Sequence, residues 1–290
     1  LFHLVKAMPT DLDKLLGLLE VERIDKFIFI GRSPKYPPRI FGGQVLAQSL
    51  NAAIRTVDDG ERMPHSLHAY FLRPGNPRKQ IVYEVDPIRD GRSFTTRRVV
   101  AKQDGIAIFS TSISFQLTEE GFDHQFEMPK VAGPEDLEDD FDYWTRIAKE
   151  QDNDNLRPMA QSVYRRPVNR RDFLDPQPEA PYQDYWFKTT GAIADEPIVH
   201  QTVLAYISDH TLLGAALLPH PATGRSGDMA LASLDHALWF HRPFRADEWL
   251  LYHQDSPSAF GARGFSRGTF YTQDGKLVAS TVQESLQRKL

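Results

Sequence analysis

Hydrophobic positions along the chain change their spacing at several points, and each change predicts a new element. From residue 10 to 19, leucines recur at helical spacing behind a Thr10-Asp11 cap, which predicts a helix. A strand-like run covers 20–30, a Pro-containing loop covers 31–38, and a segment rich in Ala, Leu and Gln predicts a second helix from Gln44 to about Thr56. Four strand-like runs follow, at roughly 66–73, 79–88, 93–103 and 106–117.

The same pattern returns in the second half of the chain. It predicts a strand at 184–190, a helix from Val199 to about Leu213, and four strands at roughly 229–241, 247–255, 261–272 and 277–287. Between the halves, residues 118–182 are rich in Pro and acidic residues, and only Phe141 to Lys149 predicts a short helix. We therefore predict an N-terminal unit over 10–117, a long solvated linker over 118–182 and a C-terminal unit over 183–290.

Short motifs recur in the two halves in the same order, which indicates an internal repeat. The alignment pairs Val45-Leu46-Ala47 with Val203-Leu204-Ala205 at a separation of 158 residues, Phe71-Leu72-Arg73-Pro74 with Phe240-His241-Arg242-Pro243 at 169, and Gln103-Asp104-Gly105 with Gln273-Asp274-Gly275 at 170. A loop insertion at 219–228 explains why the separation grows after the first motif.

Each unit then consists of one strand, one long apolar helix and about four antiparallel strands. A sheet of this kind can bury such a helix by curving around it. The pattern therefore predicts an α+β fold, a double hot-dog in which each of two curved antiparallel sheets wraps one helix. The two sheets could join edge to edge, which would protect strand edges that are otherwise exposed.

Composition narrows the possible chemistry. The 290 residues carry a formal net charge of −5 and contain no cysteine, so a thiolate nucleophile, disulfides and Cys-based zinc sites are excluded, and a strongly basic nucleic-acid surface is not expected. No apolar run approaches the ~18 residues of a membrane span, and no signal peptide is visible at the start. We expect a cytoplasmic protein without cofactor or metal.

One stretch near the C-terminus, residues 232–243, combines apolar and polar side chains without helical spacing and reads as a buried strand. Its Ser233, Asp235, His236 and His241 look like a catalytic cluster. Buried hydrogen-bonding residues that hold the strand are the better interpretation for Asp235, His236 and His241. Ser233 stays a catalytic candidate, although a filler hydroxyl bonded to the backbone would give the same pattern.

Several motifs in this order resemble the acyl-CoA thioesterase II family, and the resemblance runs from about residue 10 to 288. The motifs are Phe41-Gly42-Gly43-Gln44, His68-Ala69-Tyr70-Phe71-Leu72-Arg73-Pro74-Gly75, Arg89-Asp90-Gly91-Arg92-Ser93-Phe94, Asp235-His236-Ala237-Leu238-Trp239-Phe240-His241-Arg242-Pro243-Phe244 and Phe270-Tyr271-Thr272-Gln273-Asp274-Gly275. The resemblance implies a double hot-dog fold, hydrolysis of acyl-CoA thioesters, and assembly into a homo-oligomer, a dimer or a tetramer.

The family's catalytic Asp, hydroxyl and Gln correspond, by resemblance, to Asp209, Ser233 and Gln283. A carboxylate can serve as general base for water, and a carboxamide can both donate and accept hydrogen bonds. The positions that match the trio in the first half are Asn51, Pro64 and Ile113, which cannot do the same work. The resemblance therefore assigns catalysis to the second half, with the first half as a structural partner and a possible wall of the site.

Alternatives remain open at this point. Asp209 could be a solvated helix residue and Gln283 an outward-facing strand residue. Two other functions fit a hot-dog fold: an enoyl or hydroxyacyl thioester hydratase with His210 or His236 as base, and a non-catalytic acyl-CoA-binding protein. Basic residues that could contact the CoA phosphates stay unassigned, because exposed strand arginines fit equally well; they are Arg89, Arg92, Arg97, Arg98, Arg263 and Arg267.

A further motif, Gly264-Phe265-Ser266-Arg267-Gly268, fits the G-x-S-x-G nucleophile elbow. That elbow requires a strand, a sharp turn and a helix, followed later by the catalytic His. A strand-like run follows instead, and no histidine occurs after Ser266. We therefore exclude the α/β-hydrolase interpretation.

Overall fold

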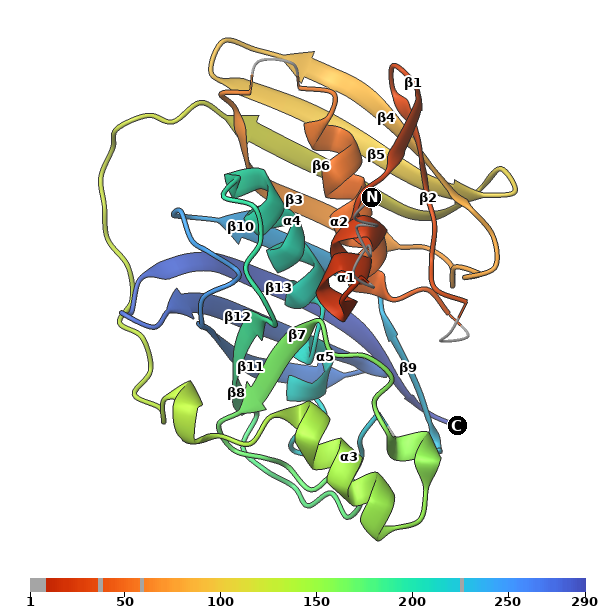
Figure 1. Ribbon diagram of the computed structural model, residues 1–290, viewed down its shortest axis with the longest axis vertical. Coiled ribbons are helices and arrows are strands. Elements are labelled where there is room, and N and C mark those ends of the chain that lie inside the picture. Colours follow the sequence, from red (N-terminus) through yellow and green to blue (C-terminus); the bar gives the residue numbers. More distant parts are fainter. Residues whose placement is uncertain (1–8, 36–38, 58–59, 225–226) are drawn as a thin grey trace, which may run out of the picture.

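Two runs of five antiparallel strands with the same order build the sheet of this protein (Figure 1). The computed structural model describes residues 9–35, 39–57, 60–224 and 227–290. In the N-terminal run the order is β2 (Ile28–Gly31), β4 (Ile81–Asp90), β5 (Phe94–Gln103), β6 (Ile106–Gln116) and β3 (Met63–Phe71). In the C-terminal run it is β8 (Tyr182–Thr189), β11 (Leu250–Phe260), β12 (Arg263–Thr272), β13 (Leu277–Lys289) and β10 (Asp235–Phe240).

The two runs join through β3 and β10, which pair antiparallel with Leu67 opposite Leu238 and His68 opposite Ala237. The join removes one free edge from each sheet, as the sequence predicted. Three short strands complete the thirteen: β1 (Glu22–Asp25) pairs with β2, β7 (Val163–Pro167) with β8, and β9 (Met229–Ser233) with β13.

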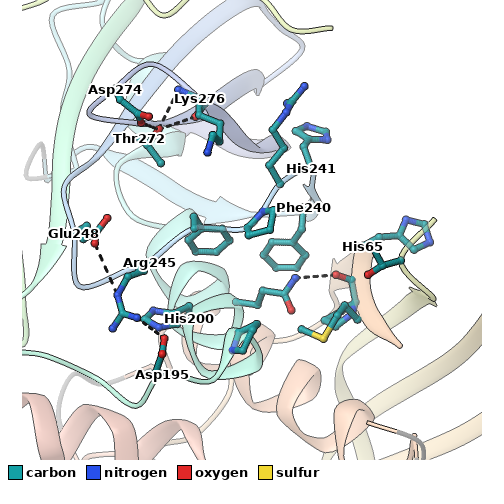
Figure 2. Close-up of a pocket in the computed structure, with 18 of the residues that line it drawn as sticks. His65, Asp195, His200, Phe240, His241, Arg245, Glu248, Thr272, Asp274 and Lys276 are labelled. Atoms are coloured by element: carbon teal, nitrogen blue, oxygen red, sulfur yellow. Dashed lines mark hydrogen bonds and ion pairs between the residues drawn. The ribbon is translucent and has the colours of Figure 1, made fainter. Parts of the chain in front are cut away.

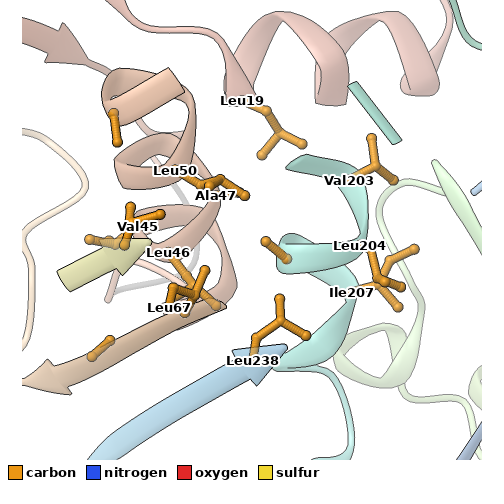
Figure 3. Packing of buried hydrophobic residues seen from close by; sticks show 14 of the residues in the cluster. Leu19, Val45, Leu46, Ala47, Leu50, Leu67, Val203, Leu204, Ile207 and Leu238 are labelled. Atoms are coloured by element: carbon orange, nitrogen blue, oxygen red, sulfur yellow. The ribbon is translucent and has the colours of Figure 1, made fainter. Parts of the chain in front are cut away.

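Two central helices lie side by side against the joined sheets (Figure 1). They are α2 (Gly42–Ile54) and α4 (Pro197–Ser208), and almost every residue of α2 is buried. Such a helix must be covered on all sides. Figure 3 shows Leu46, Ala47 and Leu50 of α2 in one buried cluster with Val203, Leu204 and Ile207 of α4, and Leu67 and Leu238 of the joining strands lie below the two helices in this view. This arrangement is the predicted α+β double hot-dog.

The remaining helices are α1 (Asp11–Leu19), α3 (Asp140–Glu150), the short α5 (Leu212–Ala215), and two 3-10 turns, Pro134–Asp136 and Asp154–Leu156. A capping box between Thr10 and Asp13 starts α1 where the sequence predicted. The predicted short helix in the 118–182 segment corresponds to α3.

The structure differs from the sequence predictions in four places. The strand-like run predicted over 20–30 forms two antiparallel strands, β1 and β2, with a turn between them. The helix predicted over 199–213 ends at Ser208, because Thr211 has a φ of +66°, which no helix accommodates. The strand predicted over 229–241 divides at Leu234 into β9 and β10. The segment predicted as a solvated linker contributes β7, whose five residues were too few to show an alternating pattern. Residues 36–38 of the predicted 31–38 loop and residues 225–226 of the predicted insertion lie outside the described residues.

Candidate active site

Asp209 follows directly after the last residue of α4, at its C-cap. Because α2 and α4 run antiparallel, this end of α4 meets the first turn of α2. The backbone N–H of Gly43 donates a 2.8 Å hydrogen bond to Asp209 Oδ2. The free N–H groups of a helix start favour a negative charge, so this hydrogen bond favours the ionised form of the Asp209 carboxyl group.

Glycine is required at this contact. A Cβ atom on Gly43 would lie 2.4 Å from the carbonyl oxygen of Tyr206, and one on Gly42 would lie 2.6 Å from Asp209 Oδ2. The Tyr206 carbonyl belongs to the backbone of α4, which cannot move away from Gly43 without separating the two helices. The pair Gly42-Gly43 therefore allows α2 and α4 to approach closely enough for the hydrogen bond to form.

The other two predicted residues, Ser233 and Gln283, meet Asp209 from neighbouring strands. Ser233 ends β9, and Gln283 is a fully buried residue of β13. Gln283 Nε2 donates to Ser233 Oγ at 2.9 Å, and the Ser233 hydroxyl donates a long hydrogen bond of 3.5 Å to Asp209 Oδ1. The structure thus brings all three sequence-predicted site residues into one hydrogen-bonded chain.

Burial sets the electrostatics of this chain. It raises the pKa of Asp209 to about 7, while the hydrogen bonds from Gly43 and Ser233 act in the opposite direction. Near neutral pH the carboxyl group is therefore present in both protonation states. A general base is most effective when its pKa lies near the working pH.

His236 adds a second layer behind Gln283. Its Nδ1 lies 2.8 Å from Gln283 Oε1, and its Nε2 lies 2.9 Å from the hydroxyl of Ser208. Burial lowers the pKa of His236 to about 4, so the ring is neutral. Since Oε1 is an acceptor, the ring proton resides on Nδ1. The histidine therefore fixes the carboxamide so that its N–H group points to Ser233.

The other polar residues of the 232–243 stretch have structural partners. Asp235 Oδ1 accepts the Glu284 backbone N–H at 2.7 Å, and His241 Nε2 lies 2.8 Å from Ser280 Oγ. Ser266 of the G-x-S-x-G motif lies buried in the middle of β12, with strand on both sides. This local structure confirms that the motif forms no nucleophile elbow.

Four of the six unassigned arginines form ion pairs with carboxylates on their own sheet, and these pairs favour structural roles. They are Arg97 with Asp90, Arg98 with Asp86, Arg263 with Glu284 and Arg267 with Asp255. Arg97 also bonds to Thr56 and is buried.

Two cavities lie beside the end of α4. One of about 180 Å³ is lined by Tyr206 and His210, and one of about 330 Å³ is lined by Tyr185 and Thr211. Both are bounded on their outer side by three residues of α3 and β7, namely Asp140, Trp144 and Arg165. A larger cavity, of about 1230 Å³, opens at the other end of α4 (Figure 2). None of these three cavities is lined by Asp209, Ser233 or Gln283.

In the described part of the chain, no group of three or more His, Asp or Glu side chains has an arrangement that could hold a metal ion. Among the same residues, no helix is long and apolar enough to cross a membrane.

Comparison with known proteins decides the family. Residues 32–116 match the model of an acyl-CoA thioesterase N-terminal domain, and residues 155–286 match the acyl-CoA thioesterase model. The chain is 39% identical over 287 residues to acyl-CoA thioesterase 2 of Haemophilus influenzae, covering 97% of this chain and 99% of that protein. The chain belongs to the acyl-CoA thioesterase family. The resemblance predicted from the sequence motifs is confirmed.

Solved structures agree with this family. The acyl-CoA thioesterase II TesB2 of Mycobacterium marinum aligns with a TM-score of 0.78 and 42% identity, over 94% of this thioesterase chain and 97% of that one. A protein of unknown function with a hot dog fold from Alicyclobacillus acidocaldarius aligns with a TM-score of 0.74 and 19% identity, over 94% and 97% of the two chains. The second likeness shows the fold alone, and the double hot-dog prediction is confirmed.

Sequence reasoning missed two contributors to the candidate site of this family member. The N–H of Gly43 is a backbone group 166 residues away from Asp209 in the chain, and only the unusual Gly-Gly pair at a helix start hinted at a close approach. His236 was interpreted as a residue that holds its strand, whereas its ring binds the side chain of Gln283. No pattern within one strand reveals which residue of another strand a histidine meets.

Proposed function

We propose that this chain hydrolyses acyl-CoA thioesters with water as the nucleophile, and that Asp209, Ser233 and Gln283 carry the reaction. Family membership supports the reaction. The observation that supports the three residues is the carboxylate of Asp209, anchored on one oxygen by Gly43 N–H and facing the linked Ser233 and Gln283 with the other.

In the proposed first step, Asp209 removes a proton from a water held near Oδ1, and the water oxygen attacks the thioester carbonyl carbon. A new C–O bond forms and the carbonyl oxygen becomes negatively charged. When this intermediate collapses, the C–S bond breaks. The CoA thiolate takes the proton from the Asp209 carboxyl group, which leaves a free acid, CoA thiol and an ionised Asp209.

Ser233 and Gln283 orient the water in this proposal. The Ser233 hydroxyl lies between the carboxylate and the carboxamide, and Gln283 Nε2 holds it at 2.9 Å. The 3.5 Å distance from Ser233 Oγ to Asp209 Oδ1 is long for a hydrogen bond. Such contacts often tighten only when substrate is bound, so this geometry is compatible with catalysis.

The proposal divides the work between the repeats. Residues 183–290 carry the three side chains, residues 118–182 connect the units, and residues 10–117 provide a wall of the site together with Gly43. We also propose that the protein is cytoplasmic, that acyl-CoA is the molecule it binds, and that it assembles into a homo-oligomer, a dimer or a tetramer.

The hydratase alternative needs a histidine base, and the surroundings of both candidates disfavour it. Burial lowers the pKa of His210 to about 3 and that of His236 to about 4, so each ring is a weak base. His236 is fully buried, and both of its ring nitrogens are engaged with protein groups. A proton on a substrate carbon could not reach it.

The test compares matched substitutions in the full-length chain, with thiol release from a series of acyl-CoA chain lengths as the readout. Asp209→Asn and Ser233→Ala are expected to reduce kcat by at least 100-fold. The control is Asp235→Asn, which keeps an oxygen for the Glu284 N–H. If Asp209→Asn retains wild-type turnover, the proposed base is wrong. Loss of an enoyl group without thiol release would favour the hydratase.

A further inference from the structure

The β3–β10 join relates the two repeats by an approximate two-fold axis. His68 lies opposite Ala237 in this pair of strands. The separation of 169 residues that aligns Phe71 with Phe240 also aligns His68 with Ala237. A residue that lies opposite its own repeat counterpart marks a two-fold axis, so every group of the candidate active site has a counterpart across it.

Four residues in or beside the candidate active site have counterparts that line the cavity of about 1230 Å³, whereas Asn51 and Ile113, the counterparts of Asp209 and Gln283, are not among its lining residues. With the separations that align the repeats, the counterparts of Gly42, Gly43, Phe71 and Ser233 are His200, Gln201, Phe240 and Pro64. All four line the cavity of about 1230 Å³. Figure 2 shows His200 and Phe240 among the side chains around it. This cavity therefore lies at the two-fold counterpart of the Gly42-Gly43 and Ser233 side of the candidate active site.

The second place lacks the groups for hydrolysis. The counterpart of Asp209 is Asn51, whose Oδ1 accepts the backbone N–H of Val21. The counterpart of Gln283 is Ile113, a buried hydrocarbon side chain. Without a carboxylate or a carboxamide at these positions, the cavity can hold a ligand but cannot activate a water as Asp209 does.

Two buried polar atoms of residues that line the cavity have no partner in the described part of the chain: His200 Nε2 and Gln201 Oε1. The two side chains are only 3% and 9% exposed. His200 Nδ1 accepts the Ala246 N–H, so Nε2 carries the ring proton and is a donor. Gln201 Nε2 donates to the Pro64 carbonyl, which leaves Oε1 as an acceptor.

An unpaired buried donor or acceptor destabilises the folded state, so a native structure rarely keeps two on neighbouring residues without a use. One donor and one acceptor on consecutive residues suit a ligand that offers a carbonyl oxygen and an N–H close together. A secondary amide has this pattern, and the pantetheine arm of CoA contains two such amides.

The remaining lining favours this neutral arm over the nucleotide end of CoA. Phe240, Phe244 and Trp249 supply apolar surface. Lysines and arginines are present, but carboxylates such as Glu119, Glu135, Asp195, Glu248 and Asp274 line the same cavity. A mixed lining of this kind does not select a polyphosphate, whereas it accepts an uncharged chain with alternating amides and methylenes.

The geometry points to a second, non-hydrolytic binding site for the pantetheine arm of CoA or acyl-CoA, built at the two-fold counterpart of the active site. This inference rests on the proposed function at Asp209, because it takes the class of ligand from the substrate. His200 and Gln201 recognise one amide of the arm, and Phe240 packs against its methylene groups.

The experiment counts CoA bound per chain by equilibrium dialysis, using the full chain with Asp209→Asn, the variant whose turnover also tests the proposed catalytic base. Two CoA molecules per chain are expected. Two further variants remove the orphan atoms: His200→Asn keeps an oxygen for the Ala246 N–H and deletes Nε2, and Gln201→Leu deletes Oε1 together with the Nε2 that donates to the Pro64 carbonyl. Either substitution, added to Asp209→Asn, is expected to reduce the count to one.

Competition identifies the part of CoA that binds. Pantetheine should displace one of two bound CoA molecules in a His200-dependent way, and adenosine 3′,5′-bisphosphate should not. A count of one in Asp209→Asn, or a count of two that neither substitution lowers, overturns the inference. If Asp209→Asn keeps full turnover while the count is two, the proposed catalytic base fails and this site stands. If Asp209→Asn is inactive and binds one CoA per chain, the proposed catalytic base stands and the second binding site is overturned.

Discussion

The N–H of Gly43, in the first turn of α2, holds one oxygen of Asp209, at the end of α4, at 2.8 Å. The two residues belong to different repeats, so the first repeat supplies a backbone group to a site whose side chains all come from the second. The contact also explains why the helices cross so closely at this end, since only glycine leaves room for the Tyr206 carbonyl.

Gly43→Ala should therefore damage both stability and activity. The added methyl group would lie 2.4 Å from the Tyr206 carbonyl oxygen, so α2 must shift. Overpacking of this kind costs about 1–3 kcal/mol, and the displaced N–H would leave Asp209, so we expect kcat to fall at least tenfold. Chemical denaturation and thiol release measure the two effects.

A matched control for this substitution is Gly17→Ala in α1, where nothing lies within 4 Å of the new methyl group. Alanine favours a helix over glycine by about 0.5–1 kcal/mol, so this variant should be slightly more stable with unchanged kcat. Equal behaviour of the two variants would contradict the close-approach argument.

The raised pKa of Asp209 predicts how activity depends on pH. The general base must be ionised, so kcat/KM should fall about tenfold per pH unit below about 7 and reach a plateau above it. An ordinary carboxyl group would place this bend near pH 4. A pH profile of hydrolysis between 5 and 9 measures it, and a flat profile down to pH 5 would be incompatible with the raised pKa.

The same group links stability to pH. The folded state raises the pKa of Asp209 above its value of 3.8 in the unfolded chain, so folding binds the proton more tightly. This contribution to stability is fully present below about pH 3.8 and is lost as the pH rises to about 7. Asp209→Asn removes this loss, so its stability relative to wild type should increase between pH 5 and 8. Denaturant unfolding at the two pH values tests the sign.

His236 is predicted to act through Gln283 rather than on the substrate. His236→Leu deletes the donor to Gln283 Oε1, so the carboxamide can rotate away from Ser233. We expect kcat to fall 10- to 100-fold with little change in KM. His236→Asn places an amide N–H near the position of Nδ1 and should recover part of the activity. If both variants lose activity equally while unfolding with the same cooperativity as wild type, the histidine has another role.

The sequence predicted the fold because the repeated spacing of hydrophobic residues indicates which faces of the helices and strands are buried. Those buried faces determine how the helices pack on the sheets. The close neighbours of the candidate site were harder to predict. Motif resemblance pointed to Asp209, Ser233 and Gln283, whereas helix periodicity alone would have extended α4 past Asp209 to Leu213. The break comes from the positive φ of Thr211, a residue type that rarely adopts it. Partners such as Gly43 and His236 depend on contacts between distant segments, which no local pattern encodes.

The segment between the repeats offers a last prediction, because it is attached to the C-terminal sheet by a buried charge cluster. Asp140 at the start of α3 is only 10% exposed at its side chain and pairs with both Arg165 of β7 and Arg170. Removing one partner of a fully buried ion pair costs about 3–5 kcal/mol. The cost here should be smaller, because the Arg165 and Arg170 side chains are 34% and 18% exposed and water screens part of the charge. Asp140→Asn should therefore loosen α3 and β7 together.

Hydrogen exchange over 140–170 is expected to accelerate in Asp140→Asn. The same substitution at the exposed neighbour Asp142 should leave the exchange unchanged. Since α3 and β7 also bound the two cavities beside the end of α4, the Asp140 variant should shift the acyl-length preference of hydrolysis more than kcat itself. Unchanged exchange in the Asp140 variant would show that the aromatic packing of Trp144 against Phe173 is sufficient to hold α3.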